Sequence, residues 1–490
     1  METAVKNRGR TTGLSPTALS PPRARWAGAF RIAIPALAIG APILAGMAWN
    51  IGPLTIGGAL AAIVVGLIAP EIGLAIVAFM GPLQPPLVIP APGFNAILVG
   101  AVVLGCVYRL PIDRPQIHLT APILLLFGFV LYVGAQQTPE MITGYAGDQG
   151  HLVAYLFGQL VTGFGAVVAA AYVLRGRSPY PFLALGLGSA VLAALLAMVT
   201  FQNPAVGPPI AGLLAHATID QRAVGSFFNP NYFGAFEAIA TVTAASWMIG
   251  THSARLRLML LGISTVLSTA MALSLSRGAV ITFAAGLLCL AFSRSRTRTA
   301  VVIAAGLIVA ALVLFPIFVE WRLSTTAGSY SASANAALTR SDEGRLSTVL
   351  AGPQLFLSSP LFGIGWGYYS AMSGQFVGPG SALEAHNWYI NVLAEEGTVG
   401  IVLWILLLVA LVMALRLRPI LPRSAGFGVL GGYAVGSLFL EPPSSFQTSA
   451  LPILVIVAAL VSDWTAPGMG APPPVGEHPH DPWVADSIAS

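Results

Sequence analysis

Long apolar stretches alternate with short polar segments along most of the chain. Because a helix needs about 20 apolar residues to cross a bilayer, each long stretch predicts one membrane span. The candidates lie at 30–49, 52–69, 71–89, 94–108, 119–137, 151–174, 180–200, 230–250, 257–275, 279–293, 300–319, 398–415, 425–440 and 448–463. Prolines at 82, 85, 86 and 90 interrupt the third, which we expect to be broken or re-entrant. The pattern predicts an all-α fold: a polytopic transmembrane helical bundle of about 12–14 spans, with one long extracytoplasmic loop that contains short helices.

Composition supports a membrane protein. Of 490 residues, 56% are hydrophobic and only 8% are charged, too few for a soluble surface. The net charge of +5 does not indicate nucleic-acid binding, because the basic residues lie in short runs between apolar stretches. Cys106 and Cys289 both lie inside apolar stretches, so neither a disulfide nor a metal site is expected. Residues 1–27 are polar and basic and lack a cleavage motif, so no cleavable signal peptide is expected.

Arginine positions predict how the bundle is oriented. Most arginines fall in alternate loops, at 109, 114, 175, 177, 255, 257, 294, 296, 298, 416, 418 and 423. With fourteen spans, all these loops share the side of the basic N-terminus, which the positive-inside rule assigns to the cytoplasm. We therefore expect a multi-pass protein of the cytoplasmic (inner) membrane with both termini in the cytoplasm.

The same pattern of apolar stretches and loops predicts five parts of the chain. These are a cytoplasmic basic tail (1–27), a transmembrane bundle (28–319), an extracytoplasmic loop carrying the candidate motifs (320–397), C-terminal transmembrane helices (398–464) and a disordered cytoplasmic tail (465–490). Within the long loop, we expect Ser341 to cap a short helix. A glycine-aromatic turn at 360–369 is expected to pack at the outer membrane surface or to line a vestibule.

The stretch 384–397 is the most informative part of the long loop. Read as a helix, it places His386, Tyr389 and Gly397 on one face, next to Asn387. Gly397 would let the chain bend just before the next span. The alternative is a polar helix start at a membrane surface with an incidental histidine.

Five arginines on the predicted outer face are exceptions to the positive-inside rule: Arg222, Arg277, Arg322, Arg340 and Arg345. Each one alone could form a surface ion pair or contact a lipid headgroup. Three of them with His386 on one face favour an anionic ligand, because the planar guanidinium pairs with phosphate oxygens.

Three acidic positions and one asparagine complete the candidates. Asn229 is expected to cap the span that begins at Pro230. Glu237 lies inside a span, where it is either functional or packed against a polar neighbour. Glu395 and Glu396 precede a span and need not be buried. No HExxH or CxxC motif occurs, so we expect no metal and no cofactor.

Several of these motifs resemble the O-antigen ligase superfamily, which also includes O-antigen polymerases and protein O-oligosaccharyltransferases. The resemblance is carried by 225–231 (GSFFNPN), 276–278 (SRG), Arg345 followed by 360–365 (PLFGIG), and His386-Asn387 followed by Gly397 and Gly400. It covers roughly residues 220–415, and the chain has more candidate spans than the twelve or so usual in this family.

The resemblance implies a metal-independent, inverting glycosyltransferase of the GT-C type in cell-surface polysaccharide biosynthesis. It would move a glycan from a polyprenyl-diphosphate carrier to an acceptor hydroxyl (on a glycan, lipid or protein) at the outer face of the membrane. Arg222, Arg277 and Arg345 would hold the diphosphate, and His386 would accept or orient the proton of the acceptor. Polymerase activity, transport of an anion or a lipid-linked glycan, and a non-enzymatic scaffold remain the alternatives.

Overall fold

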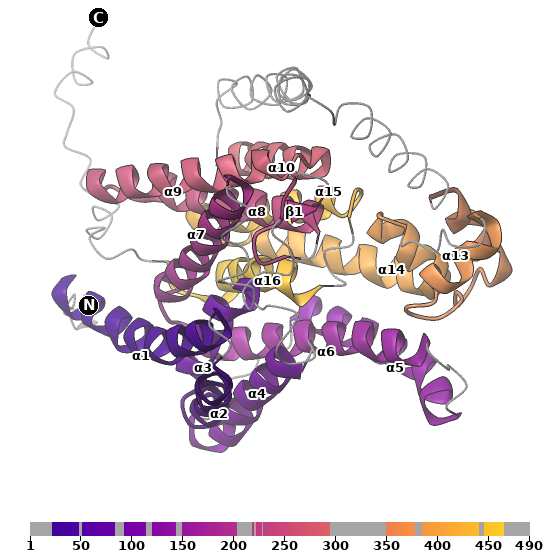
Figure 1. Cartoon of the computed structure of the whole chain (residues 1–490), viewed down its shortest axis with the longest axis horizontal. Helices are drawn as coiled ribbons and strands as arrows, with labels where there is room; N and C mark the ends of the chain where they lie inside the picture. Colours follow the sequence, from indigo (N-terminus) through magenta and orange to yellow (C-terminus); the bar gives the residue numbers. More distant parts are fainter. Residues whose placement is uncertain are drawn as a thin grey trace, which may run out of the picture.

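The fold is almost entirely helical (Figure 1). The computed structural model describes residues 22–48, 51–83, 93–113, 120–143, 149–202, 218–219, 222–227, 229–294, 349–377, 385–440 and 445–464. Within these ranges, strands are limited to the two-residue antiparallel pair β1 (Thr218–Ile219) and β2 (Arg222–Ala223). The predicted all-α helical class is confirmed.

The helices follow the apolar stretches closely. They are α1 (Pro22–Ala48), α2 (Gly52–Ile68), α3 (Pro70–Met80), α4 (Gly93–Asp113), α5 (Ala121–Thr143), α6 (Gln149–Val173), α7 (Tyr180–Gln202), α8 (Pro230–Gly250), α9 (Ala254–Leu273), α10 (Arg277–Arg294), α13 (Tyr369–Val377), α14 (Trp388–Arg416), α15 (Ile420–Gly436) and α16 (Phe446–Val461). A further short helix covers Val349–Ser358. The predicted span at 300–319 and the predicted cap at Ser341 lie outside the described residues.

Six described helices (α4, α6, α7, α8, α9 and α14) are long and apolar enough to cross a membrane. Several shorter apolar helices accompany them, α1 and α16 among them. The chain is therefore a multi-pass membrane protein, whereas the number of 12–14 spans stays a prediction. The third candidate span is broken, since α3 stops at Met80 and a 3₁₀ turn follows at Gly81–Leu83.

The centre of the bundle is α8, which is buried along most of its length. It packs against α9, α10 and α15. Close approach of α10 and α15 depends on small residues, because a Cβ at Gly428 would come within 3.3 Å of the Gly286 carbonyl oxygen. Such small-residue contacts are how helices associate without a hydrophobic driving force in lipid.

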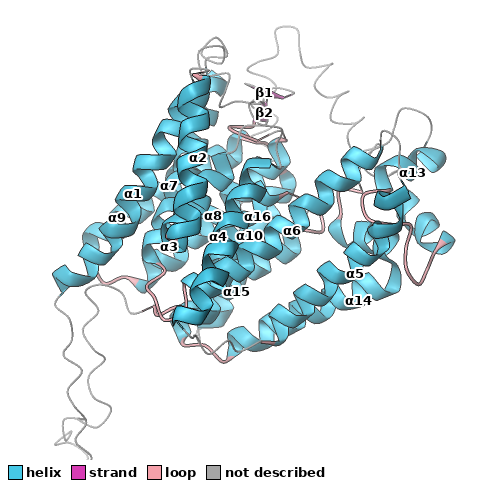
Figure 2. Cartoon of the chain, turned by 90° about the horizontal axis from the view of Figure 1, so that it is seen from below, coloured by secondary structure: helices cyan, strands magenta, loops and turns pink. Residues whose placement is uncertain are grey.

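Two helices, α5 and α14, run side by side and extend away from the rest of the bundle (Figure 2). An aromatic cluster of Phe129, Trp366, Trp388 and Trp404 joins them. Trp388 has ring-centroid distances of 5.5 Å to both Trp366 and Trp404, in edge-on arrangements. Phe129 closes the cluster at 6.3 Å from Trp366 and 5.7 Å from Trp404. Edge-to-face pairs of this kind add stability beyond their buried area.

Helix α14 is broken at Gly397, where φ is 64° and ψ is −161°. In an unbroken helix, the amides of Thr398 and Val399 would donate to the carbonyls of Ala394 and Glu395. Instead they donate to the carbonyls of Pro360 and Leu361, at 3.0 and 3.2 Å.

The two carbonyls that the break leaves open are satisfied by the same turn. Ala394 accepts from the amide of Ile364 at 3.0 Å, and Glu395 accepts from the amide of Gly365 at 2.8 Å. The 360–365 turn thus replaces both lost helical hydrogen bonds. The expectation of a bend at Gly397 is confirmed, and the turn packs on α14 and on Tyr132 of α5.

We predict that Gly397→Ala destabilises the protein by about 1–3 kcal/mol, because its backbone conformation is essentially restricted to glycine. A Cβ there would also collide with the Leu361 carbonyl. The measurement is the thermal unfolding midpoint of the purified protein in detergent. Gly188→Ala is the control, since a Cβ at Gly188 meets no atom within 4 Å. Equal midpoints for the two variants would contradict the role given to the break.

Candidate functional site

Arg222 joins three elements at one end of the bundle. Its Nε donates to the Ser274 carbonyl at 2.8 Å, and one terminal nitrogen donates to Asn231 Oδ1 at 2.6 Å. Ser274 is the C-cap of α9, and Asn231 lies in the first turn of α8. The half-buried guanidinium therefore holds β2, α8 and α9 together. Lysine could not replace this fork, because it has a single nitrogen.

The predicted cap at Asn229 is confirmed. Its side chain accepts from the Asn231 amide at 2.8 Å, and Pro230 occupies the first helical position. The cap thereby fixes the position of Asn231, which in turn holds Arg222. The sequence motif indicated the cap, whereas the bond from Arg222 to Asn231 had no signal in the sequence.

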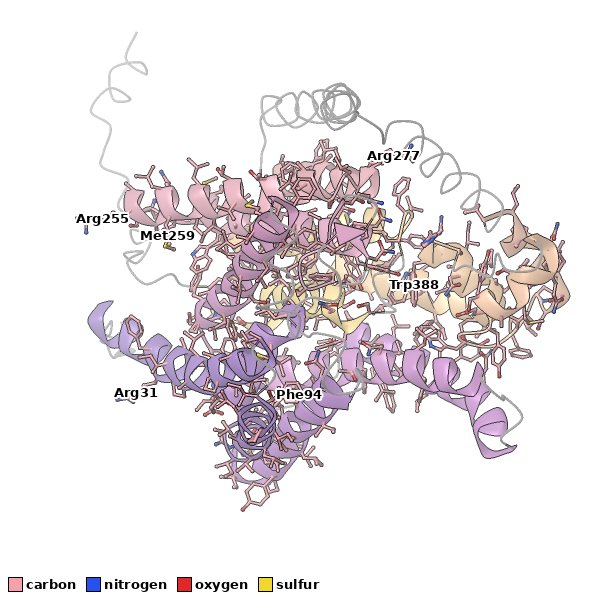
Figure 3. All side chains as sticks on the ribbon, in the orientation of Figure 1. Arg31, Phe94, Arg255, Met259, Arg277 and Trp388 are labelled. Carbon is pink, nitrogen blue, oxygen red and sulfur yellow. The ribbon has the colours of Figure 1, made fainter. Side chains whose placement is uncertain are left out.

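Arg277 is the first residue of α10 and lies on the surface (Figure 3). The turn from α9 is tight: Leu275 adopts φ 51°, and Ser276 Oγ accepts from the Ala279 amide at 3.2 Å. Residues 274–276 thus form a tight turn that joins α9 to α10. Since Ser274 belongs to the same turn, Arg222 and Arg277 lie at the same corner of the bundle.

His386 lies directly before α14 and not on its face. Its φ of 50° is left-handed, and the helix begins only at Trp388. Asn387 is the N-cap, and its Oδ1 accepts from the amides of Tyr389 and Ile390, both at 3.1 Å. The expected helical face shared by His386 and Tyr389 is therefore wrong, because the Asn387 cap starts the helix two residues later. A non-glycine residue in this conformation is uncommon and is concentrated at functional sites.

The turn 437–440 after α15 brings the two halves of the site together. On one side, the Trp388 amide donates to the carbonyls of Ser437 and Leu440, at 2.8 and 3.2 Å. On the other side, a Cβ at Gly278 would lie 3.1 Å from Phe439 Cβ. Arg277 directly precedes Gly278 and His386 lies two residues before Trp388, so the two segments that carry them flank one turn. We call this end of the bundle, defined by Arg222, Arg277, His386 and residues 437–440, the site end.

Arginines of the predicted cytoplasmic loops gather at the opposite end. Arg109 forms an ion pair with Glu71 at 3.0 Å, and Arg177 approaches the same carboxylate at 4.0 Å. The Arg177 carbonyl also accepts from the Asp463 amide. The packing therefore separates these arginines from the site end, as the loop pattern predicts.

Two glutamates beside the site are buried, against expectation. Glu395 Oε1 accepts from the Tyr369 amide at 2.8 Å, and its Oε2 accepts from Asn391 at 3.2 Å. Glu396 is fully buried, and its carboxylate oxygens have no hydrogen-bond partner within the described residues. Their burial follows from the α14 break, which folds the 360–369 turn over them. The sequence predicted the bend at Gly397 but not this burial, because hydropathy does not show which segment packs on the break.

Glu237 lies in the middle of α8 and is fully buried. Neither carboxylate oxygen has a hydrogen-bond partner in the described part of the chain. The described contacts therefore do not bear out packing against a polar neighbour. Glu237 is separate from the site end, since it lies two turns inside the helix that Asn229 caps.

Two candidate arginines, Arg340 and Arg345, lie outside the described residues. Among the residues described, no group of three His, Cys, Asp or Glu side chains could hold a metal ion. The charged groups that the structure brings together at the site end are therefore Arg222 and Arg277, with His386 across the 437–440 turn.

Residues 262–405 match the family model described as O-antigen ligase. This segment is similar to the O-antigen ligase family. The matched segment runs from α9 through most of α14, so it contains Arg277, the 360–365 turn and His386, and it ends after Gly397 and Gly400. A comparison with curated proteins found no match.

The similarity indicates a role in polysaccharide biosynthesis, the field of the glycosyltransferase-like ligases and polymerases of this family. Arg222 lies before the matched segment, so its place at the site end comes from the structure and not from the family match.

We predict that Arg222→Lys lowers the thermal midpoint while Arg277→Lys does not. The first change removes a guanidinium that donates to two elements, at a cost of about 1–3 kcal/mol. The second alters an exposed side chain, with an expected effect within about 0.5 kcal/mol. The measurement is thermal unfolding of both variants in the same detergent. A larger loss for Arg277→Lys would reverse the roles assigned here.

Proposed function

We propose that the protein transfers a glycan from a polyprenyl-diphosphate carrier to an acceptor hydroxyl, with its active site at the site end on the extracytoplasmic side. The observation that carries the proposal is that the segments carrying Arg277 and His386 both contact the 437–440 turn, through Gly278 and Trp388. Arg109 and Arg177, from predicted cytoplasmic loops, lie at the end opposite the site end. This supports placing the site end on the extracytoplasmic side, since arginine-rich loops favour the cytoplasm.

The reaction places specific demands on these residues. The acceptor oxygen attacks the anomeric carbon, its proton passes to a base, and the bond from that carbon to the diphosphate oxygen breaks. Attack from the face opposite the leaving group inverts the anomeric centre. His386 is the proposed base, because an ordinary imidazole titrates near neutral pH.

The leaving polyprenyl diphosphate gains negative charge as the bond breaks. Arg277 is proposed to hold its oxygens, since it is exposed at the rim of the site end. Arg222 is proposed to add positive charge beside Arg277 while its donors fix the corner of the bundle. Arg345 and Arg340 are proposed to join them from the long loop. No metal is required in this scheme, because guanidinium groups supply the positive charge.

We predict that His386→Ala lowers glycan transfer by about 10²–10⁴-fold, the usual contribution of a positioned base. The assay uses purified protein in nanodiscs, a short polyprenyl-diphosphate glycan, cell-derived acceptors and EDTA. It follows released polyprenyl diphosphate and the heavier acceptor. His252→Ala is the control, since this exposed histidine lies between α8 and α9 at the opposite end. Full activity of His386→Ala would remove its catalytic role.

We further predict that Arg277→Gln lowers the rate by about 10²–10³-fold, as expected for the loss of one donor to a developing oxyanion. Its thermal midpoint should remain that of the wild type, which separates a chemical effect from unfolding. In the same assay a ladder of products would identify a polymerase, and a single added glycan would identify a ligase. Loss of all activity on adding EDTA would contradict the metal-independent scheme.

A second candidate function, transport of an anion or a lipid-linked glycan, is favoured by one observation. Glu237 is buried in the middle of a span without a hydrogen-bond partner in the described residues, and intramembrane carboxyls often mark transport pathways. Counterflow of labelled substrate in proteoliposomes, lost in Glu237→Gln, would support transport. Unchanged glycan transfer by Glu237→Gln would leave the transferase as the better account.

A further inference from the structure

A cavity of about 350 Å³ lies between α5, α6, α14, α15 and α16, apart from the residues proposed for glycan transfer. Its wall is almost entirely apolar, with Gly163 and Phe164 on α6, Trp404 and Leu411 on α14, and Ile453 and Val457 on α16. Apolar cavities of roughly 150 Å³ already exclude water and accept apolar molecules. The cavity therefore suits a hydrocarbon ligand.

Polar groups in the cavity wall near the site end form hydrogen bonds with other groups of the protein. Gln159 Oε1 accepts from the Phe446 amide at 2.9 Å. The Tyr433 hydroxyl and Ser449 Oγ share a hydrogen bond of 2.8 Å. This end of the cavity lining carries no charged side chain, so it does not suit a diphosphate.

The other end of the cavity has a cation. Arg418 lines the cavity, as does Thr120, the residue before α5. Its Nε donates to the Ala459 carbonyl at 3.2 Å, while its terminal nitrogens have no protein acceptor within the described ranges. Arg416, two residues earlier, is exposed. The charge at this mouth is therefore positive and available to an anionic group.

The cavity also extends along the helices, as a lipid acyl chain would. Its lining positions on α16 run from Phe446 to Val461, a rise of about 22 Å at 1.5 Å per residue. This distance lies within the hydrocarbon core of a bilayer, which is about 30 Å thick. A chain that enters beside Arg418 would thus lie along the bundle, with its headgroup at the arginine-rich end.

We propose that this cavity binds one acyl chain of an anionic phospholipid from the leaflet at the arginine-rich end, with the lipid phosphate on Arg418. Basic pockets between transmembrane helices on the cytoplasmic side recognise anionic headgroups in this way. The lipid is a structural ligand: it fills the space between the α5–α14 pair and the rest of the bundle. It differs from the glycan donor, whose charged group belongs at the site end.

The test measures phospholipid binding to the purified full chain by native mass spectrometry, with phosphatidylglycerol and phosphatidylcholine as probes. We expect one phosphatidylglycerol to be retained per chain, with at least about fivefold weaker binding in Arg418→Gln. Arg416→Gln is the matched control, since it removes one positive charge two residues away outside the cavity wall. Equal retention of both lipids, or equal losses in the two variants, would overturn the role of Arg418.

A second measurement tests the acyl chain itself. Phosphatidylglycerol with brominated chains should quench the fluorescence of Trp404, which lines the cavity, so Trp404→Phe should lose the quenched component. Gly163→Phe should fill the space and abolish quenching, since a Cβ there is already 3.8 Å from Ile453 Cδ1. Quenching that persists in Trp404→Phe would overturn the proposal. Displacement of the brominated lipid by a polyprenyl phosphate would instead assign the cavity to the donor.

Discussion

The exchange of backbone hydrogen bonds at Gly397 is the constraint on which the site end depends. Four peptide groups leave the α14 ladder and pair with the 360–365 turn, so neither partner keeps its unpaired groups in a low-dielectric environment. Gly363 and Gly397 both adopt positive φ at the contact, where a side chain on either would strike the opposite backbone. The break thereby fastens the 360–365 turn to α14, the helix that His386 precedes.

Aromatic packing extends this constraint towards the candidate base. Trp366, directly after the turn, packs against Trp388, the first residue of α14, and Trp388 also contacts Trp404 on the other side of the helix break. Its amide is held by the turn after α15. His386, two residues before Trp388, is thus positioned by contacts from three separate segments. Its left-handed backbone persists because these contacts determine the chain on both sides.

Arginine has three different uses in this protein. Arg222 is primarily a clamp, with donors directed at α8 and α9. Arg277 is exposed beside it and is better suited to meet a ligand. Arg109, Arg177 and Arg418 anchor the opposite end, through Glu71 and through the carbonyl of Ala459. Residue type alone does not separate these uses, since each arginine has the same fork of donors.

The sequence by itself determined the helical membrane class, most helix positions and the two short motifs at the site end. These depend on local chemistry: apolar length, the Asn229-Pro230 cap and the glycine at 397. Only the tertiary structure decided that His386 precedes its helix, that Glu395 and Glu396 are buried, and that residues 437–440 join Arg277 to His386. Each of these depends on contacts between segments far apart in the chain. Hydropathy records how apolar a segment is, but it does not record which backbone will satisfy the hydrogen bonds that a broken helix leaves open.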